Sequence, residues 1–198
     1  MKTLNKRERD RLNTRAAILD ATEALLRDDG YAAVTARRVA ERAGLKSQLV
    51  HYHFSSMDEL FHEAFRRLEK GFYTRHLEAA ARPNPIKGIW DVSNSREGLD
   101  IVSEFESAAK YRKILEDDLI EIWSRFRALH STMIAKYFQD KHIDPGDFTA
   151  PVIAFLISAV GQALANEASH GFTEGHAEII EFMEKMIARL TPPETGSS

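Results

Sequence analysis

Hydrogen-bonding side chains gather on one short stretch of the sequence, and their chemistry suits binding rather than bond breaking. Residues 47–54 are expected to form roughly two helical turns that carry Ser47, Gln48, His51 and Tyr52. A glutamine amide can pair with adenine, and a guanidinium such as that of Arg37 can donate twice to guanine. These residue types are suited to contacting DNA, provided that the fold presents them on one exposed face.

The surrounding segment, residues 35–60, is expected to position them as a helix-turn-helix. Thr35 can cap a helix over residues 36–43, because its side-chain oxygen accepts from backbone amides that are free there. Gly44 permits the left-handed backbone of a tight corner. Such a unit presents its second helix to the DNA major groove, although an ordinary helical hairpin would show the same periodicity. Spacing predicts a small shared core of Val39, Ala40, Leu45, Val50 and Phe54.

The wider arrangement resembles the TetR family of bacterial transcription regulators. A helix of suitable length precedes the pair, and an acid-rich helix that Ser56 can cap follows it. The resemblance covers about the first 65 residues, and beyond them only the number and length of helices agree. The matching residues are Ile18–Gly30, Val34-Thr35, Val39-Ala40-Glu41-Arg42-Ala43-Gly44-Leu45, His51-Tyr52-His53-Phe54 and Asp58-Glu59-Leu60.

The resemblance implies DNA-binding roles for particular side chains, with Thr35 holding a phosphate at the start of the first motif helix. Leu49, His51 and Met57 depart from the family, where Thr or Ser, Tyr and Lys are usual and each donates to a phosphate. Because phosphate contacts supply much of DNA affinity, we expect either weaker binding or compensation by a basic arm. The implied DNA-binding residues are Thr35, Arg37, Lys46, Ser47, Gln48, His51 and Tyr52.

Residues 1–13 are polar and rich in Lys and Arg, and two interpretations of them stay open. They can be a frayed terminus, or an arm that contacts phosphates or the minor groove. Thr14 is predicted to cap the long helix that follows. Residues 1–56 carry 11 Lys and Arg against 7 Asp and Glu, whereas the rest carries 16 against 23. A basic front end on an acidic body favours nucleic-acid binding.

The remaining pattern is helical throughout, so the predicted fold class is all-α with about nine helices. We expect a three-helix helix-turn-helix domain over residues 1–56, a larger effector-binding and dimerisation domain over 57–190, and a disordered tail over 191–198. The helix over residues 56–81 would connect the two domains. Later helices are expected over residues 86–94, 97–110, 111–141, 151–170 and from Gly175 onward.

The resemblance also implies a small-molecule site, because helices corresponding to residues 56–81 and 86–170 enclose a ligand cavity in the family. An aromatic-rich wall with a few polar groups would suit an apolar or aromatic effector. Plain core packing is the alternative for each residue. The candidate effector-binding residues are Trp90, Phe105, Trp123, Phe126, His130 and Phe155.

The last two helices carry more apolar surface than one domain face would bury, since Ile179 and Ile180 are adjacent and point in different directions. The resemblance implies that these helices form a four-helix bundle with a second subunit. Gly161, Ala165 and Ala168 would allow close approach there. A two-fold dimer would present two recognition helices to an inverted repeat. A self-contained monomer core is the alternative.

Several classes of function are disfavoured. The chain has no cysteine, so it has neither disulfides nor thiolate chemistry. His51 and His53, two residues apart, would point to different faces of a helix, so no metal site is expected there. No cofactor is expected either. No Gly-rich phosphate loop or catalytic motif supports an enzyme. No apolar run approaches the roughly 20 residues of a membrane span, and no signal core is seen, which predicts a cytoplasmic protein.

The sequence therefore predicts a homodimeric transcriptional regulator, with repression preferred to activation, that a small molecule releases from a palindromic operator. The alternative is a helical protein-interaction module without operator-specific DNA binding. Salt dependence separates the two, because counterion release accompanies phosphate contacts.

Overall fold

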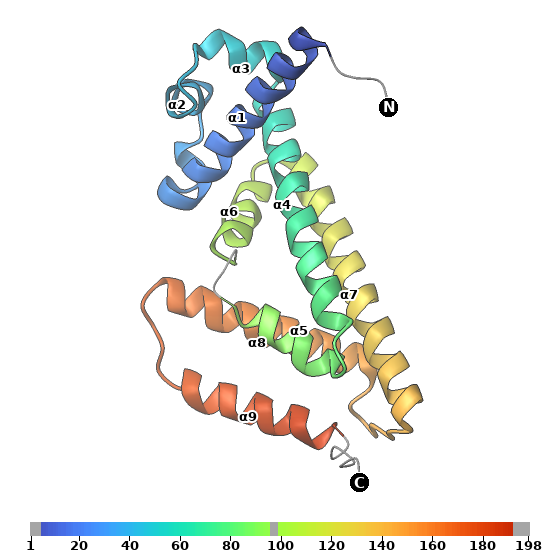
Figure 1. Cartoon of the computed structure of the whole chain (residues 1–198). Helices are drawn as coiled ribbons and strands as arrows, with labels where there is room; N and C mark the ends of the chain where they lie inside the picture. The colour runs from blue at the N-terminus through green and yellow to red at the C-terminus, as the bar shows by residue number, and fades with distance from the viewer. Residues whose placement is uncertain (1–4, 96–98, 192–198) are drawn as a thin grey trace. The chain divides into compact units, whose positions relative to one another are not determined.

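The computed structural model describes residues 5–95 and 99–191, and within these ranges the regular structure is entirely helical (Figure 1). This confirms the predicted all-α fold class. The helices are α1 (Lys6–Asp29), α2 (Ala36–Arg42), α3 (Ser47–His53), α4 (Met57–Ala80), α5 (Pro85–Ser93), α6 (Leu99–Ala109), α7 (Lys113–Lys141), α8 (Ala150–Ser169) and α9 (His176–Arg189), with the 3-10 turn η1 at Tyr31–Ala33.

The chain forms two compact units, and helices α4 and α7 contribute residues to both. The first unit comprises residues 1–70 and 101–120, and the second comprises residues 71–100 and 121–198. The functional boundary predicted after residue 56 stays a prediction. Apart from Thr191, the tail predicted over 191–198 lies outside the described residues.

Helix α1 begins earlier than the sequence pattern predicted. Asn5, not Thr14, is its N-cap: Asn5 Oδ1 accepts from the Glu8 amide at 2.9 Å, and Glu8 Oε2 accepts from the Asn5 amide at 2.9 Å. This reciprocal capping box satisfies two amides that the helix leaves free. Thr14 lies inside the helix, where its hydroxyl donates to the Asp10 carbonyl. Frayed structure is therefore the wrong interpretation for residues 5–13, and residues 1–4 lie outside the described ranges.

In the first unit, helix α4 begins at a side-chain cap, and both α1 and α4 carry buried apolar side chains. Ser56 Oγ accepts from the Glu59 amide at 3.0 Å, which confirms the predicted cap. Ser55 donates twice to the Glu59 carboxylate, and these hydrogen bonds hold the pKa of Glu59 below its ordinary value. The buried apolar side chains of these two helices include Ile18, Leu25, Leu26, Leu60 and Phe61.

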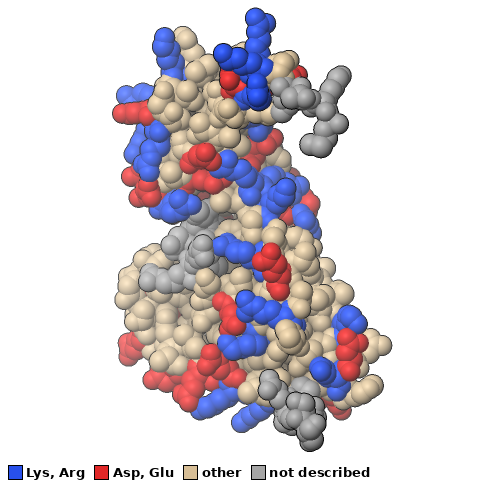
Figure 2. All heavy atoms as spheres, in the orientation of Figure 1, with Lys and Arg blue, Asp and Glu red and all other residues tan. Residues whose placement is uncertain are grey.

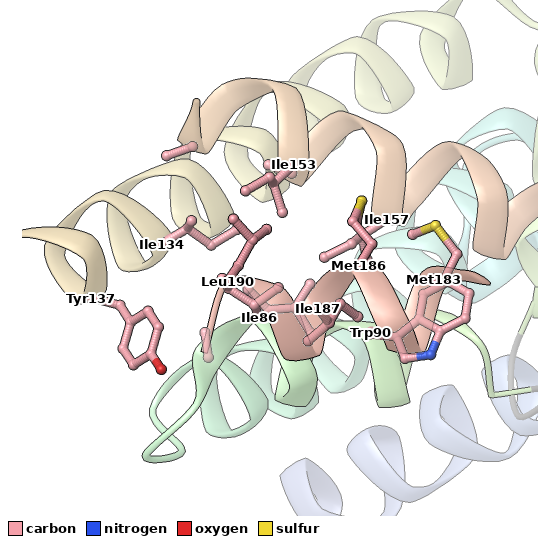
Figure 3. Close-up of a cluster of buried hydrophobic side chains, with 14 of the residues drawn as sticks. Ile86, Trp90, Ile134, Tyr137, Ile153, Ile157, Met183, Met186, Ile187 and Leu190 are labelled. Atoms are coloured by element: carbon pink, nitrogen blue, oxygen red, sulfur yellow. The ribbon is translucent and has the colours of Figure 1, made fainter. Parts of the chain in front are cut away.

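In the second unit, α5, α7, α8 and α9 enclose an apolar core (Figure 3). Trp90 of α5 is 1% exposed and is the largest fully buried side chain. Asn84 caps α5 by accepting from the Lys87 amide and donates through Nδ2 to Thr191 at 2.8 Å. The other core side chains include Ile86, Ile134, Ile153, Ile157, Met183, Met186 and Ile187.

Two glycines allow α5 to approach its neighbours closely. A Cβ added at Gly88 would lie 2.1 Å from the Ala79 carbonyl oxygen, and one at Gly161 would lie 2.5 Å from the Ser93 carbonyl oxygen. Gly161 was expected to serve close approach between subunits. It is instead buried against α5 of its own chain, because α8 crosses α5 there.

Helix α8 corrects the expectation that no segment is long and apolar enough to span a membrane. It has 20 residues, with a window of mean hydropathy 1.4. The expectation was based on uninterrupted apolar runs, and Ser158 and Gln162 interrupt this segment without lowering its average much. A core helix meets the same criterion, and Ile153, Ala154 and Ile157 of α8 are fully buried in the second unit.

Candidate nucleic-acid interface

The turn between α2 and α3 has the geometry that its sequence predicts. Thr35 Oγ1 accepts from the Arg38 amide at 3.3 Å and so caps α2. Gly44 has φ of 67°, which is the left-handed region that glycine enters most readily. The Leu45 amide then donates to the Ala40 carbonyl at 2.8 Å and closes the corner. The sequence therefore determines where the chain turns from α2 into α3.

The predicted core of this motif is present beneath the turn. Val39, Ala40, Val50 and Phe54 are each at most 2% exposed, and Leu45 is half-buried. Because these side chains hold one face of α3 against α2, the polar face of α3 is left toward solvent. This arrangement confirms the helix-turn-helix.

Every side chain that the family resemblance assigned to DNA is exposed. Tyr52, the large aromatic side chain of the set, is 74% exposed. Of the departures from the family pattern, His51 is exposed, whereas Leu49 and Met57 are half-buried. The apolar Leu49 and Met57 are thus partly enclosed by the fold. The exposed set is Thr35, Arg37, Lys46, Ser47, Gln48, His51 and Tyr52.

Ion pairs distinguish the arginines of α2 from one another. Arg38 pairs with Asp29 at 3.0 Å, and Arg42 pairs with Asp28. Both pairs tie α2 to the end of α1. Arg37 has no ion-pair partner within the described part of the chain, so its charge remains available to an anionic ligand.

Further ion pairs fix α1 against the start of α4. Arg67 donates to Glu23 at 2.5 Å and to Asp20 at 2.7 Å, and the hydrogen bond with Glu23 is the main reason that the pKa of Arg67 is raised. Arg15 pairs with Glu63 at 3.1 Å and lies over the Phe54 ring. The helix-turn-helix is therefore held on the α1–α4 side as well as through its own core.

A second set of contacts, missed by the sequence analysis, joins the end of α1 to α6 and the turn before α7. The Glu104 carboxylate accepts from the Tyr31 amide at 2.6 Å. Arg112 Nε donates to the Tyr31 hydroxyl at 2.9 Å, and the same guanidinium pairs with Asp58 and lies over the Phe61 ring. These partners are separated by up to 81 residues, so no local spacing could have identified them.

The candidate effector residues fall into four environments. Phe126 and His130 lie together, Trp90 belongs to the apolar core of the second unit, and Phe105 stacks edge-on against Phe65 in the first unit. Trp123 and Phe155 are 50% and 49% exposed. The structure thus brings together only part of the predicted set.

Phe126 and His130 belong to an aromatic cluster with His76 and Tyr73, in which His130 is buried and the other three rings are partly buried. His76 Nδ1 lies 3.0 Å from His130 Nε2, so one of these nitrogens donates to the other. The Phe126 ring is edge-on to His76 and to Tyr73. Burial is the main cause that lowers the pKa of His76 to about 3 and of His130 to about 4. His130 Nδ1 is buried with no hydrogen-bond partner among the described residues.

Basic side chains gather where α1 begins and α3 lies, as Figure 2 shows for one face of the molecule. The described residues contain no group of three or more His, Asp or Glu arranged to hold a metal ion. The exposed polar face of α3 and this basic surface are the features of the first unit that suit a polyanion.

Comparison with known proteins identifies this domain. Residues 18–64 match the family model of bacterial regulatory proteins, tetR family. This match assigns residues 18–64 to the DNA-binding domain of the TetR family. The matched segment is the domain of DNA-binding regulatory proteins, which supports a regulator rather than an enzyme. A search of curated protein sequences found no match.

Solved structures share the fold of this chain over nearly its whole length. A putative TetR-family transcriptional regulator from Rhodococcus sp. is 16% identical, with a TM-score of 0.71, covering 91% of this chain and 100% of its own. A putative regulator from Saccharomonospora viridis in complex with choline is 19% identical, with a TM-score of 0.70 and coverages of 90% and 94%. SmeT in complex with triclosan is 17% identical, with a TM-score of 0.69 and coverages of 94% and 98%.

Proposed function

We propose that the protein is a homodimeric repressor that binds an inverted-repeat operator and is released from it by a small-molecule effector. The observation that carries the proposal is the exposed polar face of α3, with Gln48 and Tyr52 on it and the unpaired guanidinium of Arg37 on α2 (unpaired within the described ranges). We prefer repression to activation because a protein that occupies an operator can block transcription without any further contact. The compartment of such a protein is the bacterial cytoplasm, where its DNA lies.

The first test of the proposal concerns the contacts that side chains of α2 and α3 would make with the edges of DNA bases. Selection of purified protein against random DNA is expected to enrich an inverted repeat, with affinity that falls steeply with salt. On that site, replacing both Arg37 and Gln48 with alanine is expected to weaken binding about 30-fold or more, since each good base contact contributes about 1–3 kcal/mol.

The matched control is Arg27→Ala, which removes an exposed arginine from the last turn of α1 on the same unit. Circular dichroism would establish that both variants remain folded. If the double variant keeps wild-type operator affinity, Arg37 and Gln48 do not contact the bases. If no site is enriched and binding is insensitive to salt, the protein-interaction alternative takes the place of the DNA-binding proposal.

Dimerisation is proposed through the outward faces of α8 and α9. Met183 and Ile187 of α9 are buried in the core, whereas Ile179 and Phe182 are 40% and 66% exposed. On α8, Val152 and Phe155 are exposed as well. Exposed apolar side chains on adjacent helices of one unit are typical of a subunit interface, and a second copy would cover them by two-fold symmetry.

Phe182→Glu tests this interface. It is expected to raise the dimer dissociation constant at least tenfold, because each two-fold interface would bury two charged side chains in place of two rings. Sedimentation velocity at several concentrations measures the change. Phe148→Glu, at an exposed phenylalanine that lies outside α8 and α9, is the control and is expected to leave the dimer intact. A Phe182 variant as dimeric as the wild type would contradict the proposed surface.

The effector is proposed to bind in the second unit near Phe126 and His130. Support comes from the aromatic cluster around His76 and from the buried His130 Nδ1, which a polar group of an effector would satisfy. Both imidazoles are uncharged at neutral pH because burial lowers their pKa. An uncharged aromatic molecule with one hydrogen-bonding group fits these features, and the similar structure of SmeT is a complex with triclosan. Such an effector would release the protein from DNA only if it bound the DNA-free arrangement of the dimer more tightly than the DNA-bound arrangement.

A further inference from the structure

The corner between α1 and α2 is held by two side chains that lie far along the chain. Residues 30–35 are the whole connection between these helices, so their conformation sets the direction in which α2 leaves α1. The Glu104 carboxylate of α6 accepts from the Tyr31 amide at 2.6 Å, and Arg112 Nε donates to the Tyr31 hydroxyl at 2.9 Å. Both side chains lie outside the segment that matches the family model, so that match gives neither of them a role in DNA binding.

Gly30 leaves room for Glu104 at this corner. It has φ of 76° and ψ of 173°, a conformation that residues with a side chain rarely adopt. A Cβ added there would lie 3.2 Å from Glu104 Oε2, the atom that accepts from the Tyr31 amide. The chain therefore leaves α1 at a residue whose missing side chain lets the carboxylate reach the backbone.

Arg112 joins the same corner to the start of α4. The guanidinium that donates to Tyr31 also pairs with Asp58 in the first turn of α4. It lies over the Phe61 ring at 4.6 Å and over the Tyr31 ring at 5.6 Å, and these two rings are 5.2 Å apart. Because a planar guanidinium can stack on a ring while its separate nitrogens donate, one side chain restrains both elements.

These contacts are better shielded from water than the ion pairs that also tie α2 to α1. The side chain of Arg112 is 23% exposed, whereas those of Arg38 and Arg42 are 41% and 43% exposed. Exposed ion pairs contribute little, since water screens them and the long side chains lose freedom. Phe61 is fully buried and offers Arg112 a fixed surface. The contacts of Arg112 with Tyr31 and Phe61 are therefore expected to restrain the corner more than the exposed pairs do.

We propose that Arg112 and Glu104 are positioning residues for DNA binding, which fix the corner at Tyr31 and so set the angle at which α2 and α3 meet the DNA. The proposal rests on the DNA-binding function proposed above. Helices α2 and α3 move as one body, because Val39 and Val50 are buried in their shared core. A change of angle at the corner therefore displaces the whole exposed face of α3, and a binding site tolerates displacements of only about 0.5 Å.

Two conservative variants test Arg112 on full-length protein. Arg112→Lys keeps the positive charge without the planar guanidinium, and Tyr31→Phe removes only the hydroxyl. Each is expected to lower affinity for the selected operator about threefold to tenfold, because one hydrogen bond contributes about that much. Affinity for unrelated duplexes and the salt slope are expected to stay unchanged, since no phosphate contact is lost. The double variant is expected to bind like Arg112→Lys, in which the hydroxyl has already lost its partner.

The matched control is Lys113→Arg, which makes the reverse exchange at the neighbouring residue. The Lys113 side chain is 72% exposed and pairs with Glu116 and Asp117 of its own helix. This variant is expected to bind the operator as the wild type does. Thermal unfolding of every variant sets a temperature at which all of them are folded, and binding is measured there.

Glu104 is tested by rescue with a conservative variant. Glu104→Ala removes the acceptor of the Tyr31 amide and is expected to lower operator affinity about threefold to tenfold. Glu104→Gln keeps a side-chain oxygen that can accept from the same amide, so it is expected to bind the operator nearly as the wild type does. Equal losses in the two variants would contradict the role of this hydrogen bond.

Three further results would overturn the positioning role of Arg112. Equal losses on the operator and on unrelated duplexes would show a general effect on DNA attraction. Unchanged operator affinity in Arg112→Lys, with or without a lower midpoint of thermal unfolding, would show that the contacts do not position the corner for DNA. Additive losses in the double variant would show that Arg112 and Tyr31 act separately. If the wild-type protein enriches no operator, the DNA-binding function itself is contradicted, and the positioning role with it.

Discussion

Replacing Gly88 with alanine is expected to destabilise the second unit by about 3 kcal/mol or more. Alanine is favoured over glycine inside a helix by about 1 kcal/mol, so helix propensity alone would predict the opposite sign. The added Cβ, however, would lie 2.1 Å from the Ala79 carbonyl oxygen. Backbone atoms cannot move away as a flexible side chain can, so α5 must shift from the end of α4 and disturb the core around Trp90.

Gly71→Ala is the matched control for this prediction. Gly71 lies inside α4, and a Cβ added there meets no atom within 4 Å. This variant is therefore expected to be stabilised by about 0.5–1 kcal/mol. Chemical denaturation of both variants, followed by circular dichroism and by tryptophan fluorescence, to which buried Trp90 and half-exposed Trp123 both contribute, measures the difference. A Gly88 variant that unfolds at the same midpoint as the wild type would show that α5 and α4 are not held this closely.

The parts of this structure that the sequence predicted are those governed by neighbouring residues. Thr35 caps α2 and Gly44 turns the corner because each acts on backbone groups a few residues away. The capping box of Asn5 and Glu8 was equally local, and its Asn-x-x-Glu spacing could have been recognised. It was missed because the polar composition of residues 1–13 was taken as a sign of fraying, although an exposed helix can be polar on all sides.

The parts that escaped prediction depend on contacts between distant residues. Neither the contact of Arg112 with Tyr31 nor the approach of Gly161 to Ser93 has a signature in local spacing. The same limitation affected the effector residues. Trp123 and Phe155 are as aromatic as Phe126, but about half of each side chain is exposed, and only the packing of α7 and α8 decides this. Periodicity identifies an apolar face without identifying what covers it.

Lowering the pH from 7.5 to 5 is expected to cost the second unit about 2–4 kcal/mol through the imidazole pair of His76 and His130. Their pKa values in the folded protein are about 3 and about 4, against an ordinary value of 6.5. Burial is the main cause, with added repulsion from Arg75 on His76 and from Arg127 on His130. The pair lies at 3.0 Å, where two charged rings would repel strongly.

The sign follows from proton binding. Because the folded-state pKa values are lowered, the unfolded chain binds more protons than the folded protein between pH 6.5 and about 4. The stability contributed by the neutral pair is therefore fully present above about pH 6.5. It is lost as the pH falls, by about 1.4 kcal/mol per unit for each imidazole.

Replacing both histidines with leucine isolates this contribution, because leucine fills much of the volume and cannot titrate. The loss of unfolding free energy between pH 7.5 and pH 5 is expected to be about 2–4 kcal/mol smaller in the double variant than in the wild type, whatever the absolute stability of the variant. His170→Gln, at an exposed histidine of the same unit, is the control and is expected to retain the wild-type difference. If the double variant lost as much unfolding free energy between pH 7.5 and pH 5 as the wild type, the two histidines would not contribute to the pH dependence. Their pKa values in the folded protein would then not be lowered. The buried, uncharged environment proposed for the effector would then be ruled out as well.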